Sequence, residues 1–220
     1  MVEDYAKNVF SSLEPHAIII SYQWDYFVSA SYYFQLVEHT REDVAVIDKE
    51  LMRRSWYYLQ LETRYPELIH RVKSEVDAFL KELYKFEHDL PYDATAIEYR
   101  YNALIKSIID SNIKSRPVYV TYEIEPQYTT KYNRVPSGLA FQLFSDSLYH
   151  DIHTPDFLFN PILRDDRYSR QIISLYAMAY TNKAIYLNLY GKNEQSELFL
   201  DKALQISPNF PDAVSLKHRF

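Results

Sequence analysis

Two amino acids that many enzymes depend on are scarce in this chain of 220 residues. Cysteine is absent, which excludes disulfides, thiolate nucleophiles and zinc–thiolate sites. Glycine occurs twice, as Gly138 and Gly191, whereas a glycine-rich phosphate loop or a dinucleotide-binding fingerprint needs several glycines within a few residues. The sequence therefore predicts neither kind of nucleotide cradle and indicates no cofactor.

Long hydrophobic runs and an excess of positive charge are also lacking. No segment approaches the roughly 18 continuous apolar residues that a membrane-spanning helix requires. The first twenty residues have neither a basic start nor a small-residue cleavage site, so we expect no secretory signal there. The net charge of −6 argues against a phosphate-binding nucleic-acid face. We expect no membrane insertion by this chain itself and no nucleic-acid partner.

Apolar and aromatic residues are abundant instead. Hydrophobic residues make up 47 % of the chain, which is typical of a globular protein with a substantial core. The 22 tyrosines combine an apolar ring with a polar tip, so many of them are expected at half-buried surfaces or in clefts.

Three short β-branched runs separated by helical segments predict an α/β fold. The runs lie at residues 17–22, 44–48 and 117–122, and strand–helix–strand order implies parallel pairing. We expect a short, mostly parallel sheet of three to four strands, with residues 139–144 as an antiparallel edge strand. The helices that flank this sheet are predicted near residues 26–39, 49–63, 74–88 and 94–115.

The pattern divides the chain into three parts. Residues 1–145 are predicted to form the α/β domain, and residues 146–166 a linker or wrapping loop that contains Pro155, Pro161 and several aspartates. Residues 167–220 are predicted to form a helical cap.

The cap resembles a single tetratricopeptide repeat of about 34 residues, which supplies a helical hairpin. A solitary repeat cannot bury its own apolar face, so it must pack on the rest of the chain, and repeats of this type are typical of protein binding. Tyr180 and Lys183 depart from the usual pattern, as expected for a terminal unit. The positions that carry the resemblance are Ala184, Leu187, Gly191, Ser196, Leu200, Ala203 and Pro208.

Polar and aromatic residues follow the carboxyl ends of the three predicted strands, where parallel sheets bind ligands. One interpretation is a pocket for a polar ligand such as a sugar, with carboxylates accepting hydroxyl hydrogens and Trp24 offering a stacking face. The alternative is that Asp25 and Asp48 cap helices and pair with the nearby arginines. The candidate ligand-binding residues are Tyr22, Trp24, Asp25, Asp48, Lys49, Arg53, Arg54 and Glu123.

Catalysis and metal binding have weaker support in the residues. Two carboxylates could act as general acid and base, as in glycosidases, but spacing in sequence does not set their separation in space. We therefore assign no catalytic residue. His150, Asp151, His153 and Asp156 could seed a metal site, although such a cluster in a loop is more often a solvated surface, and no metal ligand is assigned.

A resemblance to a known family covers about residues 5–145. This region resembles the soluble part that follows the membrane spans in a domain-of-unknown-function family of bacterial polytopic proteins. That family is similar to protein O-mannosyltransferases, which are GT-C-type glycosyltransferases. The segments that carry the resemblance are 13–19, the pair Trp24–Asp25, 48–51, 53–57, 117–121 and 135–139.

The resemblance implies a non-catalytic role, because the reactive loop of GT-C enzymes lies between membrane spans that this chain lacks. We expect an accessory domain that binds a protein or peptide beside a membrane-bound glycosyltransferase. The alternatives are a sugar-binding module or carbohydrate-active enzyme that uses the strand ends, and a free-standing soluble adaptor. The resemblance implies the extracytoplasmic face of a membrane; without it, a cytoplasmic location is expected.

Overall fold

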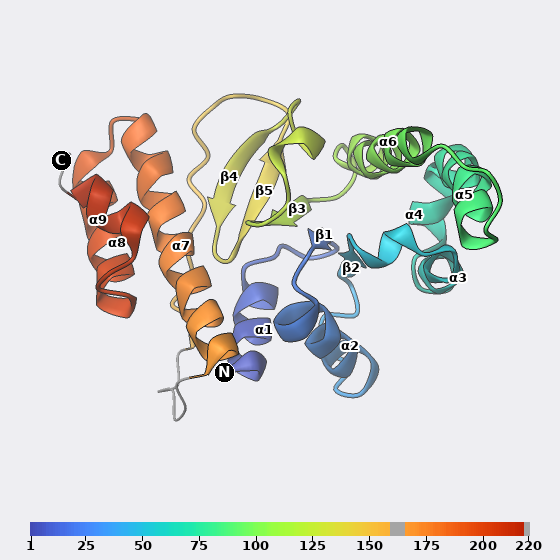
Figure 1. Ribbon diagram of the computed structural model, residues 1–220. Coiled ribbons are helices and arrows are strands. Elements are labelled where there is room, and N and C mark those ends of the chain that lie inside the picture. Colours follow the sequence, from blue (N-terminus) through green and yellow to red (C-terminus); the bar gives the residue numbers. More distant parts are fainter. Residues whose placement is uncertain (159–165, 218–220) are drawn as a thin grey trace.

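The computed structural model describes residues 1–158 and 166–217. Its centre is a five-stranded sheet of order β2-β1-β3-β5-β4, with helices on both faces (Figure 1). Strand β1 (Ile18–Ser21) pairs in parallel with β2 (Ala45–Asp48) on one side and with β3 (Val118–Thr121) on the other. The α/β class and the three parallel strands are thus confirmed.

The antiparallel part of the sheet differs from the prediction. Strand β5 (Ala140–Phe144) pairs antiparallel with β3, but it is an inner strand, and β4 (Asn133–Ser137) forms the edge. The sequence hides β4 because Pro136 cannot donate a ladder hydrogen bond, which an edge strand tolerates. A two-residue loop joins β4 to β5, and Gly138 adopts a φ of +56° within it.

One face of the sheet is buried under the middle third of the chain. Alternate strand residues, such as Ile18 and Ile20, pack there against helices α3 (Ser55–Arg64), α4 (Pro66–Arg71), α5 (Lys73–Glu87) and α6 (Ala94–Asn112). Helix α6 begins after Asp93, whose carboxylate accepts hydrogen bonds from Thr95 N and Ala96 N at 2.8 and 3.2 Å.

The opposite face is covered by helices from both ends of the chain. Ile19, Val46 and Tyr119 share a core there with α1 (Val2–Ser11), α2 (Ser29–Leu36) and the first half of α7 (Arg167–Leu189). Strands with both faces buried read as continuous apolar runs, which is why they were predictable. Short turns precede two of the predicted helices: the π-helical turn η1 (Trp24–Val28) and the 3-10 turn η2 (Leu51–Arg53). A third, η3 (Pro126–Tyr128), follows β3.

The helical hairpin expected at the end of the chain is present. Helix α7 turns into α8 (Asn193–Ile206), and α9 (Pro211–Lys217) packs beside them (Figure 1). Ala184 and Ala203 are fully buried, and Ser196 Oγ donates a 2.8 Å hydrogen bond to Ala184 O, which requires a close approach of the two helices. Gly191 has a φ of +72° in the turn between them.

Residues 145–158 form neither helix nor strand and connect the sheet to the hairpin. Asn8 exchanges two hydrogen bonds with the backbone of Leu158, at 2.7 and 2.9 Å. Lys183 Nζ donates to Ile152 O at 2.6 Å. The rest of the predicted loop, including Pro161, lies outside the described residues. Within the described part, no helix is long and apolar enough to cross a membrane.

Candidate functional site

A cleft of about 600 Å³ lies at the carboxyl ends of β1 and β2, and we call it the strand-end cleft. Its walls come from four places in the sequence: the residues after β1, the turn after β2, the residues after β3 and the first turn of α7. The lining residues are Tyr22, Gln23, Trp24, Asp25, Tyr26, Asp48, Glu50, Leu51, Glu123, Arg167, Tyr168 and Gln171.

The first wall is shaped by η1. The amides of Phe27 and Val28 both donate to Gln23 O, at 3.0 and 2.9 Å, so the chain leaves β1 through a widened turn. This turn buries its last residues in the core and leaves the side chains of Trp24 and Asp25 exposed at the cleft. Single π-helical turns are frequent at functional sites.

One of the lining carboxylates, Glu123, is hydrogen-bonded to a neutral side chain. Both oxygens of Glu123 lie 2.8 Å from Gln23 Nε2, and Gln23 Oε1 in turn accepts a 2.9 Å hydrogen bond from the Tyr5 hydroxyl. Burial raises the pKa of Glu123 above its ordinary value, and the hydrogen bond from Gln23 only partly opposes this. Glu123 forms no ion pair with any described residue.

Asp48 is a second buried carboxylate in the cleft. Its Oδ1 accepts a 2.8 Å hydrogen bond from Leu51 N and so caps the short turn η2. Burial raises the pKa of Asp48 more than its backbone hydrogen bonds lower it. Tyr26 lies beside these acids, and its pKa is raised to about 12 by burial and then by the charges of Glu123 and Asp25.

Two of the predicted cations are bound next to the cleft rather than in it. Lys49 is buried, with its Nζ 2.7 Å from Glu125 Oε1 and 3.1 Å from Glu50 Oε1. Burial alone would lower the pKa of Lys49, but these two carboxylates outweigh it and raise the pKa. Arg53 forms a two-pronged pair with Glu98, at 2.7 and 3.1 Å. Both cations are already neutralised by acids of this chain.

Five of the eight candidate residues therefore line the strand-end cleft: Tyr22, Trp24, Asp25, Asp48 and Glu123. Lys49, Arg53 and Arg54 do not, and Arg54 is exposed at the start of α3. The alternative interpretation had Asp25 and Asp48 pair with Arg53 or Arg54. No such ion pair forms among the described residues, and Arg53 pairs with Glu98 and Glu50 instead. Asp48 caps the turn η2, as the alternative interpretation expects, and it also lines the cleft, as the ligand-pocket interpretation expects.

Some lining residues were missed from the sequence. Gln23 and Glu50 adjoin predicted positions and could have been included as neighbours. The three residues Arg167, Tyr168 and Gln171 are contributed by α7, more than forty positions beyond Glu123 in the chain. Nothing in the sequence indicates that this helix starts at the rim of the cleft.

The histidine cluster in the connecting segment is not arranged as a metal site. The His150 ring stacks on Phe144 with centroids 3.7 Å apart, and its Nε2 lies 2.7 Å from Asp146 Oδ1. Across residues 1–158 and 166–217, no group of three or more His, Asp and Glu side chains could hold a metal ion.

Comparison with known families gives one match, to a family model described as TMEM260-associated domain 2, over residues 2–68. This stretch is similar to that domain. The match runs from α1 to α4 and covers under a third of the chain, including every candidate residue except Glu123. It is consistent with a domain associated with a mannosyltransferase. No curated protein and no solved structure matches the chain.

Proposed function

We propose that this chain is an accessory binding domain of a mannosyltransferase-like membrane protein. Its strand-end cleft binds a polypeptide segment that carries a lysine or arginine. The observation that carries the proposal is the unbalanced charge of the cleft, where four carboxylates and one arginine form part of the lining. The similarity of residues 2–68 to TMEM260-associated domain 2 supports the association with a mannosyltransferase.

The acids that line the cleft differ in whether a cation of this chain already pairs with them. Glu50 is bound by Lys49 and Arg53, so it contributes little to a ligand. Among the described residues, Asp48 and Glu123 accept hydrogen bonds from neutral groups alone, and burial raises the pKa of each. A cation that enters the cleft would stabilise both carboxylates without breaking an internal ion pair.

Exposed aromatic rings favour the same class of ligand. Tyr22 is 51 % and Trp24 44 % exposed, although both line a concave surface. The Tyr22 ring already attracts the ammonium of Lys49, which lies 5.0 Å from its centroid. A second cation above Trp24 would gain a similar interaction, and Trp24 attracts cations more strongly than tyrosine does.

The helical hairpin contributes to this function as a tetratricopeptide-like cap. Helix α7 starts at the rim of the cleft, and its first half is part of the core beneath the sheet. A polypeptide bound in the cleft would therefore contact both the α/β part and the hairpin.

A second candidate is a sugar-binding module, and the exposed ring of Trp24 favours it. Trp24 contacts Tyr32 edge-on with centroids 6.2 Å apart, which leaves a flat face for a pyranose ring. Glu123 and Asp25 could accept hydrogen bonds from sugar hydroxyls. An enzyme of the glycosidase type would use the raised pKa of Asp48 or Glu123 for a general acid.

Calorimetric titration of the purified chain separates these candidates. The probes are a lysine-rich peptide, its glutamate counterpart, and mannose. We expect the lysine peptide alone to bind, and Trp24→Ala and Asp25→Asn each to weaken binding at least about tenfold. Trp56→Ala and Asp77→Asn are matched controls, because both residues are exposed outside the cleft.

Other outcomes change the assignment. Binding of mannose alone would favour the sugar-binding module, and equal binding of the two peptides would contradict the charge argument. Turnover of a glycoside or a lipid-linked sugar that is lost in Asp25→Asn would establish the enzyme alternative. For a cationic ligand, affinity should fall as pH falls through the raised pKa values of Glu123 and Asp48, because protonation neutralises both carboxylates.

A further inference from the structure

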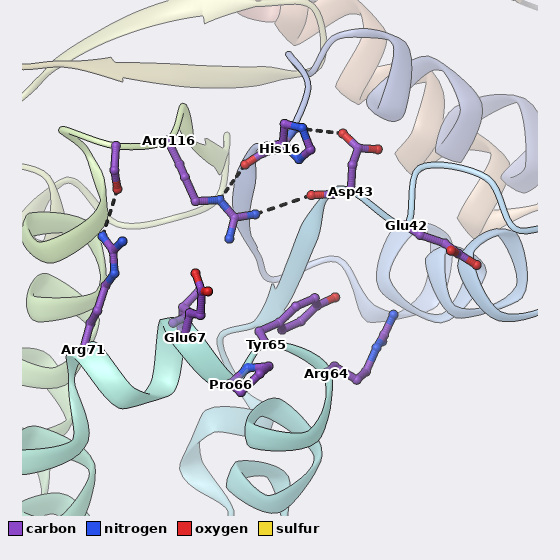
Figure 2. Close-up of a pocket in the computed structure, with 11 residues that line it drawn as sticks. His16, Glu42, Asp43, Arg64, Tyr65, Pro66, Glu67, Arg71 and Arg116 are labelled. Atoms are coloured by element: carbon purple, nitrogen blue, oxygen red, sulfur yellow. Dashed lines mark hydrogen bonds between the residues drawn. The ribbon is translucent and has the colours of Figure 1, made fainter.

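A second pocket, of about 610 Å³, lies where the parallel strands begin, at the opposite edge of the sheet from the strand-end cleft. His16, Asp43 and Arg116 precede β1, β2 and β3 respectively and form one wall. The other wall is α4 with the residues before it, from Arg64 to Arg71 (Figure 2). We call it the strand-start pocket.

Arg116 is the central cation of this pocket. Its Nε donates to His16 O at 2.6 Å, and its Nη2 lies 3.3 Å from Ala17 O and 3.4 Å from Asp43 O. These three acceptors are backbone carbonyls at the starts of β1 and β2. The guanidinium therefore holds the strands in place through two of its nitrogens, while Nη1 has no hydrogen-bond partner among the described residues.

Two more arginines reach the pocket from the other wall. Arg71 donates through Nη1 to Ser111 O and Ser115 Oγ, at 3.2 and 2.9 Å. Arg64 donates to Gln35 Oε1 at 2.6 Å and lies over the Tyr65 ring. In the part of the chain that the structure describes, none of these arginines forms an ion pair with a carboxylate.

Two of the three carboxylates that line the pocket interact with groups other than these three arginines. Asp43 pairs with Arg41 at 3.0 Å and accepts a 2.8 Å hydrogen bond from His16 N, and Glu42 lies 2.6 Å from His39 Nδ1. Glu67 is exposed and lies near Arg116 in Figure 2, beyond ion-pair distance. Three guanidinium groups thus face a pocket with one uncommitted carboxylate.

We propose that the strand-start pocket binds a phosphate group, held by Arg71 and Arg116 with Arg64 at the rim. Guanidinium groups match the oxygens of phosphate in geometry and charge, and they form short, charge-assisted hydrogen bonds to them. The binding partner is a phosphomonoester, carried either by a soluble molecule or by a lipid headgroup.

The burial of Arg116 is compatible with this assignment. Burial lowers the pKa of Arg116; Tyr65 opposes this effect, Arg71 adds to it, and Glu67 and Asp43 oppose it. A bound phosphate would stabilise the charged guanidinium in this partly buried position. Glu67 opposes the phosphate through its own charge, so it is expected to limit the affinity.

Calorimetry with inorganic phosphate and pyrophosphate, at physiological ionic strength, tests the soluble source. Sedimentation with phosphatidylcholine vesicles, with and without phosphatidic acid, tests the lipid source. Arg71→Gln should weaken binding about tenfold, and Glu67→Gln should strengthen it several-fold. Arg100→Gln is the matched control, since Arg100 is an exposed arginine on α6 outside this pocket.

Phosphate binding alone would identify a soluble ligand, and vesicle binding that depends on phosphatidic acid and on Arg71 would identify a lipid. The proposal is overturned if neither probe binds at about 10 mM phosphate. It is also overturned if Arg71→Gln and Arg100→Gln weaken binding equally, because that result indicates overall charge. Trp24→Ala should leave phosphate binding unchanged, which keeps this test independent of the strand-end cleft.

Discussion

The two edges of the parallel strands carry opposite chemistry. At the strand-end cleft, the buried Asp48 and the half-buried Glu123 form no ion pair with any described residue. At the strand-start pocket, Arg71 and Arg116 likewise form no ion pair with a carboxylate in the part of the chain that the structure describes. The strands between them are buried along their whole length and mostly apolar, and they separate the two sites.

This difference shows how one sheet can place two unlike sets of side chains at its opposite edges. Each strand is only four residues long, so a short apolar segment separates the residue before it from the residue after it. Parallel pairing then gathers all the starts at one edge and all the ends at the other. Each edge also contains one residue that the fold itself requires, Gly138 at one edge and Arg116 at the other. Substitution of these two residues should lower the stability more than substitution of the residues that line the cleft or the pocket.

The largest loss of stability is expected for Gly138→Ala, in the loop between β4 and β5 next to the carboxyl end of β3. A Cβ at this position would lie 1.9 Å from Ser12 Oγ, and the φ of +56° adds backbone strain. We expect the free energy of unfolding, measured with urea, to fall by about 2–5 kcal/mol. Gly191→Ala has no atom within 4 Å of the new Cβ and should cost only about 1 kcal/mol. Equal losses would contradict the close contact with Ser12.

At the other edge, Arg116→Met should lower the free energy of unfolding by about 2–4 kcal/mol, because three backbone carbonyls lose a hydrogen bond and, among the described residues, only Ala17 O keeps another donor, Ala45 N. Arg71→Gln, which faces the same pocket, should cost less than about 1 kcal/mol, since its partners are exposed to water. If both variants melt with the wild type, Arg116 does not hold the strand starts.

Glu123→Gln should have the opposite effect and raise the free energy of unfolding at neutral pH by about 1 kcal/mol, because the substitution removes a charge from a mostly desolvated position. The pKa of Glu123 is higher in the folded than in the unfolded state, so the folded protein binds this proton more tightly. The contribution of Glu123 to wild-type stability therefore decreases as pH rises from the ordinary glutamate pKa to the raised one. Unfolding curves over this range should show that decrease in the wild type and not in the variant. A variant less stable than the wild type at neutral pH would show that the charge is compensated.

The smallest change in stability is expected for Trp24→Ala, within about 0.5 kcal/mol, because the ring is 44 % exposed and lies against the half-buried ring of Tyr32. Its effect should appear in ligand binding instead. A large loss of stability, measured by thermal unfolding, would place Trp24 in the core and remove it from the proposed site.

The parallel half of the fold could be predicted because its strands are buried on both faces and form uninterrupted apolar runs. Strand β4 could not, because Arg134 and Pro136 make it look like a loop, and its pairing with β5 depends on tertiary structure. Helix α7 was predicted, but its contact with Tyr5 through Tyr176, with ring centroids 5.6 Å apart, depends on tertiary packing. The three-part domain division stays a prediction.

The part of the candidate site that could be predicted is the part that directly follows the strands. Tyr22, Trp24, Asp25 and Asp48 follow β1 and β2 directly, so the rule for parallel sheets places them together. The pairing of Arg53 could not be predicted, because its partner Glu98 comes from α6 and sequence spacing carries no information about that contact. The strand-start pocket was not predicted, since its arginines lie in three separate segments.

The position of β1 between β2 and β3 also affects the order in which the protein can fold. Ile18 pairs with Val118, so β1 waits for a partner strand that follows the whole α3–α6 segment. Asn8 in α1 must then find Leu158, at a still greater sequence separation. Closing such long loops slows folding, and until β3 arrives one edge of an apolar strand stays open to other chains. We expect refolding to be slow and to lose material to aggregation at high protein concentration.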